Sequence, residues 1–234
     1  MDKLRLIFKD RELRRKILFV LGILEVFRAA ATLPIPGINP LRLKAMFEGN
    51  QFLGLLNIFS GGGLANLSIA MLGVGPYITA TIIMQLLTMI FPQLKKLYYE
   101  EGAQGRAKFN RISRYLTVPF AALQGYGFLN LLMAQNVLPG LERFSLAMLA
   151  NVVIVTAGTM VLLWIGELIT EQKIGNGVSL IIFAGIISSL PQTIGQIGAQ
   201  YFSAGGFSAS PDLPSHLMFI VISVVVIAGV VFIQ

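Results

Sequence analysis

Long apolar stretches alternate with short polar segments along this chain of 234 residues. A helix needs about 20 predominantly apolar residues to cross a bilayer, and six stretches approach or reach that length. The pattern therefore predicts an all-α polytopic membrane protein with six transmembrane helices. The predicted spans cover residues 17–33, 69–91, 115–133, 146–169, 178–197 and 217–234.

Basic residues indicate how these spans are oriented. The N-terminal tail, residues 92–114 and the loop around Lys173 contain most of the 18 Lys and Arg residues, whereas the alternate loops contain few. Because cytoplasmic loops carry an excess of these residues, the bias predicts a cytoplasmic N-terminus. No small-residue cleavage site follows the first apolar stretch, so we expect the first span to stay in the protein.

Composition narrows the function classes. Hydrophobic residues make up 55% of the chain and charged residues only 12%, against about 25% charged residues in a typical soluble domain. His216 is the single histidine and cysteine is absent. No GxxxxGK phosphate-binding loop occurs, and no cluster of nucleophiles or metal ligands is apparent. We therefore expect a protein that is not an enzyme and that needs no cofactor or metal.

Glycines interrupt the apolar pattern between the first two predicted spans. They occupy positions 61 to 63, and Gly73 and Gly75 precede Pro76, after which an uninterrupted aliphatic run begins. Non-helical backbone at membrane depth is tolerated where protein or a water-filled cavity surrounds it. The pattern favours a re-entrant segment beside a pathway. A kinked packing helix, or an amphipathic helix on the external surface over residues 52–60, is the alternative.

Two charged residues lie within the first predicted span. Glu25 and Arg28 are separated by three positions and can pair on one helical face, which offsets the cost of placing either charge in lipid. We interpret them as a structural ion pair near the external end. The alternative is a substrate or proton site of a secondary transporter with a broken helix, although no other buried ionisable residue completes a relay.

Four stretches of the sequence together point to a known family. They are FRAAATLPIPGI at residues 27–38, NIFSGGGL and GVGPYITATIIMQLLT within residues 57–88, EGAQGRAKFNRISRYLT at residues 101–117, and GELITEQKIGNGVSLIIFAGI at residues 166–186. In this order they resemble the SecY/Sec61 family of protein-conducting channels. The resemblance implies a ten-helix channel with two inverted halves, of which residues 1–197 would form the first. Residues 217–234 would be the sixth helix, and we expect the chain to be part of a longer protein.

The resemblance also implies roles for individual residues. Three isoleucines match the pore constriction, where aliphatic side chains exclude water and ions yet yield to a passing polypeptide. They are Ile78, Ile82 and Ile182. Residues 57–68 match the plug, with Asn57, Phe59, Ser60, Gly61, Gly62, Gly63, Leu64 and Asn66 as its site residues. The polar residues expected at the lateral gate are Gln85, Thr88 and Gln124.

The function implied by the resemblance is that of the central channel subunit of a Sec translocon in the bacterial cytoplasmic membrane. Such a channel passes unfolded polypeptides and releases transmembrane segments sideways into lipid. Implied partners are the SecE and SecG subunits, the SecA ATPase or the ribosome, secretory signal sequences, nascent membrane proteins and lipid, with no specific nucleic acid sequence. Glu25 departs from the apolar residue expected there. A secondary transporter and a membrane scaffold without a conduit are the competing hypotheses.

Overall fold

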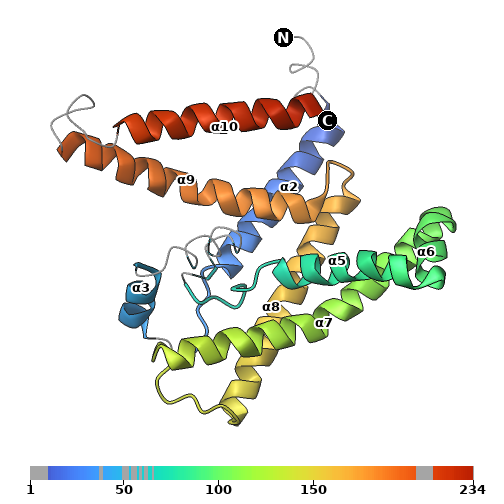
Figure 1. Ribbon diagram of the computed structural model, residues 1–234, viewed down its shortest axis with the longest axis horizontal. Helices are drawn as coiled ribbons and strands as arrows, with labels where there is room; N and C mark the ends of the chain where they lie inside the picture. Colours follow the sequence, from blue (N-terminus) through green and yellow to red (C-terminus); the bar gives the residue numbers. More distant parts are fainter. Residues whose placement is uncertain are drawn as a thin grey trace. The chain divides into compact units, whose positions relative to one another are not determined.

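The computed structural model describes residues 10–36, 39–48, 53, 57, 60, 63–64, 66–203 and 213–233. Its helices are α2 (Arg11–Ala30), α3 (Pro40–Glu48), α5 (Gly75–Ile90), α6 (Pro92–Tyr99), α7 (Gly102–Ala134), α8 (Leu146–Glu171), α9 (Gly177–Ser203) and α10 (Leu213–Ile233) (Figure 1). The described residues contain an isolated bridge between Pro34 and Ser68 but no named strand. The chain divides into two compact units, Met1–Ser189 and Leu190–Gln234.

Two of the described helices, α7 and α8, are long and apolar enough to cross a membrane. Helices α5 and α6 bend by 113° at the break between them and would form a third span if counted together. Residues 177–188 and 217–232 form shorter apolar helices. The architecture is therefore that of an all-helical membrane protein, and the six spans remain a prediction.

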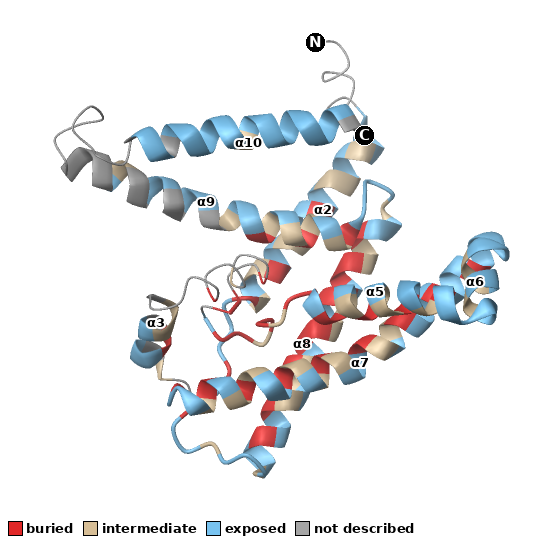
Figure 2. Ribbon diagram, viewed as in Figure 1, coloured by how far each residue is buried: buried red, intermediate tan, exposed pale blue. Residues whose placement is uncertain are grey.

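Helices α5, α7 and α8 form the centre of the first unit. Every fourth residue along α7 is buried from Gly105 to Leu129, and most residues in this row are small. Small side chains let neighbouring helices approach closely. Helix α5 buries a matching row, which comprises Pro76, Ala80, Met84 and Thr88. Figure 2 shows these buried positions along the facing sides of the helices.

The chain between α3 and α5 forms turns rather than helix over the described residues 66–74. The backbone N–H of Ile35 donates to the Leu67 carbonyl at 2.9 Å, and that of Ile69 donates to the Leu33 carbonyl at 3.0 Å. Leu67 and Gly73 have positive φ angles of 42° and 57°, which a right-handed helix does not accept. Helix α5 consequently begins at Gly75 rather than at residue 69, where the second span was predicted to start.

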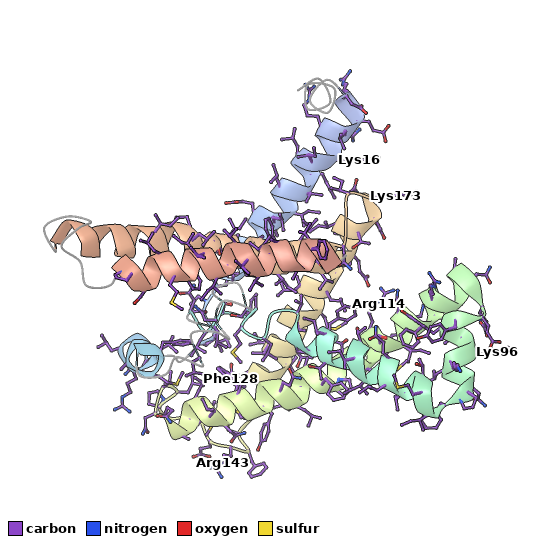
Figure 3. The ribbon with its side chains drawn as sticks, turned by 45° about the horizontal axis from the view of Figure 1, so that its top comes forward. Lys16, Lys96, Arg114, Phe128, Arg143 and Lys173 are labelled. Atoms are coloured by element: carbon purple, nitrogen blue, oxygen red, sulfur yellow. The ribbon has the colours of Figure 1, made fainter. Side chains whose placement is uncertain are left out.

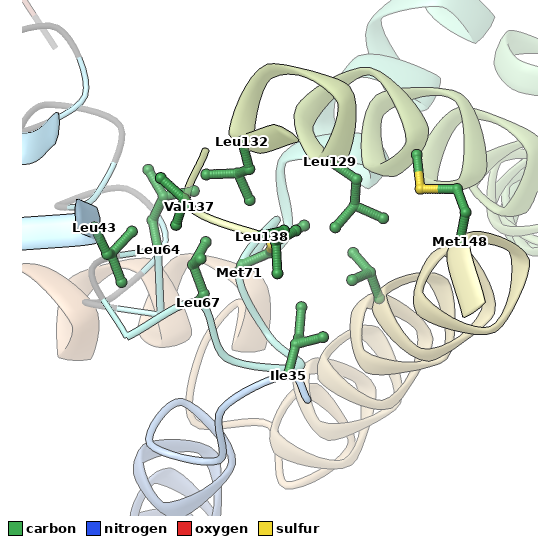
Figure 4. Close-up of a cluster of buried hydrophobic side chains, with 11 residues drawn as sticks. Ile35, Leu43, Leu64, Leu67, Met71, Leu129, Leu132, Val137, Leu138 and Met148 are labelled. Carbon is green, nitrogen blue, oxygen red and sulfur yellow. The ribbon is translucent and has the colours of Figure 1, made fainter. Parts of the chain in front are cut away.

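This irregular segment is sheltered by protein. Its side chains join a hydrophobic cluster with the end of α7, the following turn and the start of α8 (Figure 4). The buried members are Ile35, Leu43, Leu64, Leu67, Met71, Leu129, Leu132, Val137, Leu138, Met148 and Val155. The glycine pattern predicted shelter of this kind, and burial of the segment supplies it.

The second unit contains the end of α9 and all of α10. Helix α10 exposes large hydrophobic side chains from Leu217 to Phe232 (Figure 2). A helix with an apolar surface on every side lies in lipid or against other polypeptides rather than in water.

Candidate functional site

Two cavities meet at a pair of isoleucines in the first unit. The larger one, here called the polar cavity, has a volume of about 710 Å³. The smaller one, the apolar cavity, has a volume of about 490 Å³. Ile78 of α5 and Ile182 of α9 line both cavities, and Ile82 lines the polar cavity. The structure thus brings together all three isoleucines that the sequence placed at a constriction.

The start of α5 aims two of these side chains at the same space. Pro76 lies in the first turn, where its missing N–H costs no helical hydrogen bond. Ile78 and Ile82 are four residues apart and therefore share a face. The row that contains Ala80 and Met84 is buried instead. One face of α5 thus packs in the protein while the other lines the cavities.

The start of α9 positions Ile182 against α8. The Gly177 N–H donates to the Thr170 hydroxyl oxygen at 2.9 Å, and the Ser179 N–H donates to the Asn176 side-chain oxygen at 3.2 Å. Gly177 lies so close to the Gly166 carbonyl of α8 that a Cβ at this position would overlap it. The glycines in this part of the sequence therefore set a close approach between α8 and α9.

An ion pair lies in the polar cavity. Arg114 Nη1 of α7 donates to Glu167 Oε2 of α8 at 2.6 Å, and the two side chains are 38% and 34% exposed. Figure 3 labels Arg114, which is well separated along α7 from Phe128 of the apolar cavity. The other polar residues lining the cavity are Tyr77, Thr81, Gln85, Asn110, Thr170, Glu171, Asn176 and Ser179. These groups can form hydrogen bonds with the backbone and the polar side chains of a peptide.

The apolar cavity is lined mainly by hydrocarbon. Its polar lining side chains are Ser60 and Gln124. The Ser60 hydroxyl is already satisfied, because it donates to the Asn57 carbonyl and accepts the Leu64 N–H, each at 3.0 Å. The apolar lining residues are Leu64, Met71, Leu72, Val74, Ile78, Phe128, Leu131 and Ile182. Such a lining gives water few partners.

The described part of the predicted plug lies beside this cavity. Ser60 and Leu64 line the cavity, and Gly63 is buried. A Cβ on Gly63 would lie 2.9 Å from the Ser68 hydroxyl oxygen, so only glycine fits there without a shift. Asn57 is half-buried, and the exposed Asn66 donates from Nδ2 to the Ala31 carbonyl at 3.5 Å. The predicted plug residues Phe59, Gly61 and Gly62 lie outside the described residues.

A family model described as SecY matches residues 68–234. The chain is 39% identical, over 97% of its length, to the protein translocase subunit SecY of Streptomyces scabiei and covers 53% of that protein. It is 40% identical, over 96% of its length, to the same subunit of Bacillus licheniformis, of which it covers 52%. For the subunit of Aquifex aeolicus the identity is 43% over 82% of this chain and 46% of the relative. This chain belongs to the SecY family.

The chain spans about half the length of the curated SecY relatives it matches. The matched region contains all three isoleucines and the whole of α5, α7, α8 and α9. The plug residues before position 68 precede it. The family model thus covers the helices that line the two cavities.

The structure does not gather the predicted gate residues of this SecY-family chain at one place. Gln85 lines the polar cavity, whereas Gln124 lines the apolar cavity, with its Nε2 at 3.5 Å from the Thr79 hydroxyl oxygen. Thr88 is buried, and its hydroxyl donates to the Gln85 carbonyl at 2.6 Å. Thr88 belongs to the buried row of α5, which explains why it faces neither cavity.

Sequence reasoning missed the ion pair of the polar cavity. The sequence placed Arg114 in the basic segment of residues 92–114 and Glu167 within the predicted span of residues 146–169. The two residues are 53 positions apart. Arg114 directly precedes the predicted span at residues 115–133, and Glu167 lies near the end of its own predicted span. No local spacing rule joins them, because their contact depends on how α7 crosses α8.

Proposed function

We propose that this chain forms part of the central channel subunit of a Sec translocon. The channel passes unfolded polypeptides across the cytoplasmic membrane of a bacterium and releases transmembrane segments laterally into lipid, without catalysing a reaction. The observation that supports the proposal most is the convergence of Ile78, Ile82 and Ile182, from two helices, on one cavity. Relatives named protein translocase subunit SecY support the same function.

The three isoleucines would act as an aliphatic ring. Their side chains offer no hydrogen bond to water or ions, so a narrow neck between them loses its water. Aliphatic side chains can change rotamer when an extended polypeptide pushes between them. A polar cavity on one side of the ring would accept the hydrated polypeptide, and an apolar cavity on the other would keep the resting channel dry.

We propose residues 57–68 as the plug that occupies the apolar side. The hydroxyl of Ser60 bonds within the segment itself, so displacement need not break these contacts. Helices α5 and α7 would form one side of the lateral gate, with Gln85, Thr88 and Gln124 as its polar residues. Their opposing helices would belong to the second half of the channel.

The topology follows from the same proposal. Residues 1–197 would form the first half, with six spans in the chain, a cytoplasmic N-terminus and the sixth helix at residues 217–234. SecE and SecG would surround the channel, and SecA or the ribosome would dock on the cytoplasmic side. A secondary transporter is disfavoured, since the proposed neck is aliphatic and its substrate-site candidate Glu25 is exposed on α2.

Ion conductance of the resting channel tests the ring. The complete protein with Ile78→Ser and Ile82→Ser, assembled with its membrane partners, should leak ions in planar bilayers about tenfold faster than the wild type, because hydroxyl groups rewet the neck. Ile90→Ser is the control: it lies on the same helix, is 69% exposed and lines neither cavity. Unchanged conductance of the double variant at normal expression would exclude the ring.

A cross-link tests the plug. This chain has no cysteine, so once any cysteine elsewhere in the complete protein is replaced, Leu64→Cys and Ile78→Cys can be joined by a short bifunctional thiol reagent across the apolar cavity that both residues line. The cross-linked channel should stop secreting a reporter protein. Free secretion after efficient cross-linking would contradict the plug assignment.

A further inference from the structure

The ring isoleucines lie on helices that do not share a continuous piece of chain. Ile78 and Ile82 are on α5, and Ile182 is on α9. Helix α5 packs on α7, where the Gln124 side-chain amide lies 3.5 Å from the Thr79 hydroxyl oxygen. Helix α9 begins in close contact with α8 at Gly166. The separation between the two sides of the ring therefore depends on how α7 is held to α8.

Helices α7 and α8 are fastened differently at their two ends. At the C-terminal end of α7, Leu129 and Leu132 share a hydrophobic cluster with Met148 and Val155 of α8 (Figure 4). Gly125 continues this contact, since a Cβ added there would lie 3.5 Å from the Val155 side chain. The ion pair of Arg114 with Glu167 joins the opposite ends of the same helices, next to the polar cavity.

Glu167 lies at the point where α8 meets both neighbours. The preceding residue, Gly166, contacts Gly177 of α9. Three positions after Glu167, the Thr170 hydroxyl accepts a hydrogen bond from the Gly177 N–H. Less than one turn of α8 thus separates the ion pair from the contacts with α9. A movement of Glu167 would therefore move the start of α9. Because the hydrophobic cluster fixes the far end, loss of the ion pair would let α7 swing about that end.

We propose that the Arg114–Glu167 ion pair is a brace that sets the spacing between the two sides of the aliphatic ring. While the pair is formed, α5 and α7 stay close to α8 and α9, and the ring stays closed. When the pair separates, Ile78 and Ile82 move away from Ile182. The two charged residues position the ring and do not themselves form it. This inference rests on the proposed channel function.

Charge removal and charge exchange test the brace in the complete protein with its membrane partners. Arg114→Gln and Glu167→Gln should each raise the resting ion leak about two- to fivefold, in keeping with the strength of a partly exposed ion pair. The exchange variant, Arg114→Glu with Glu167→Arg, should return the leak toward the wild-type value. Arg114→Lys keeps the charge and should leak less than Arg114→Gln, which provides a second comparison if the exchange variant does not accumulate.

A distance measurement reads the same motion without relying on conductance. Spin labels on Gln85→Cys of α5 and Ser179→Cys of α9 report across the polar cavity that both residues line. Their distance distribution should broaden and lengthen in Arg114→Gln and narrow again in the exchange variant. Glu12→Gln is the matched control, because it breaks the 2.6 Å ion pair with Lys16 within α2 and should change neither leak nor distance.

The possible results separate the brace from the channel function. If the ring variants leak while Arg114→Gln and Glu167→Gln change neither leak nor distance, the brace is wrong and the channel proposal stands. If the ring variants do not leak but Arg114→Gln lengthens the distance, the ion pair positions the helices and the aliphatic ring of the proposed channel is excluded. If Glu12→Gln acts like Glu167→Gln, the effect is general charge loss and the brace is overturned.

Discussion

The polar and apolar cavities are neighbours built from different chemistry, although α5, α7 and α9 contribute to both. Hydroxyl, amide and charged groups line the first, and hydrocarbon lines most of the second. The change occurs at the start of α5, where Val74 and Gly75 line the apolar cavity, Ile78 lines both cavities, and Thr81 and Gln85 line the polar cavity. A single helix thus contributes polar residues to one cavity and apolar residues to the other, with Ile78 at the border.

The apolar cavity depends on a close contact between α8 and the irregular segment before α5. Helix α8 comes so close to the irregular segment at Gly158 that a Cβ there would overlap the Ile69 carbonyl. This contact fixes the segment whose next residues, Met71 and Leu72, line the apolar cavity. The polar cavity has a comparable glycine contact, between Gly166 of α8 and Gly177 of α9, but its lining comes from helices and Asn176 rather than from the irregular segment.

Gly158→Ala should destabilise the packing of α8 against the segment that lines the apolar cavity. The added methyl group meets backbone, so we expect destabilisation of about 1–3 kcal/mol, the usual cost of overpacking, seen as a lower melting temperature of the purified protein in detergent. Gly127→Ala is the matched control, since Gly127 lines the apolar cavity but has nothing within 4 Å of an added Cβ. Equal melting temperatures for the two variants would show that the close contact at Ile69 is not essential.

Water should reach the polar cavity more readily than the apolar cavity. Because the chain has no cysteine, single variants report one site each. A charged, membrane-impermeant thiol reagent should modify Thr81→Cys in the polar cavity about tenfold faster than Leu72→Cys in the apolar cavity, because apolar surroundings disfavour the reactive thiolate. Denatured samples, in which both thiols should react alike, provide the control. Equal rates in the folded protein would mean that water fills both cavities.

Several features of this site could be predicted from the sequence because they depend on local rules. The spacing of four residues placed Ile78 and Ile82 on one helical face. The residues Gly73, Gly75 and Pro76 predicted a break before an uninterrupted aliphatic run, and α5 begins at Gly75. The match to a family also predicted Ile182 as their partner, which periodicity alone did not.

Other features depend on contacts between distant parts of the chain. The turns before α5 are held by hydrogen bonds from Ile35 and Ile69 across more than 30 positions, so the helix begins at Gly75, after residue 69, where the second span was predicted to start. Helix α7 begins at Gly102, well before the predicted third span at residue 115. Polarity marks where a helix leaves the lipid, whereas the helix itself continues into water. The Arg114–Glu167 pair likewise required the crossing of α7 and α8.

Substitution of Gln124 in the apolar cavity should have the smallest effect of these variants. Gln124 is one of two polar side chains lining the apolar cavity, and its 3.5 Å approach to the Thr79 hydroxyl is at the outer limit for a hydrogen bond. Gln124→Leu should therefore change the free energy of unfolding by less than about 0.5 kcal/mol, because a weakly paired polar group is exchanged for an apolar one of similar size. Gln85→Leu makes the same exchange in the polar cavity and should slow modification of Thr81→Cys. If Gln124→Leu instead lowered stability by more than about 1 kcal/mol, Gln124 would be making a strong polar contact, and the second cavity could no longer be treated as a dry, apolar space.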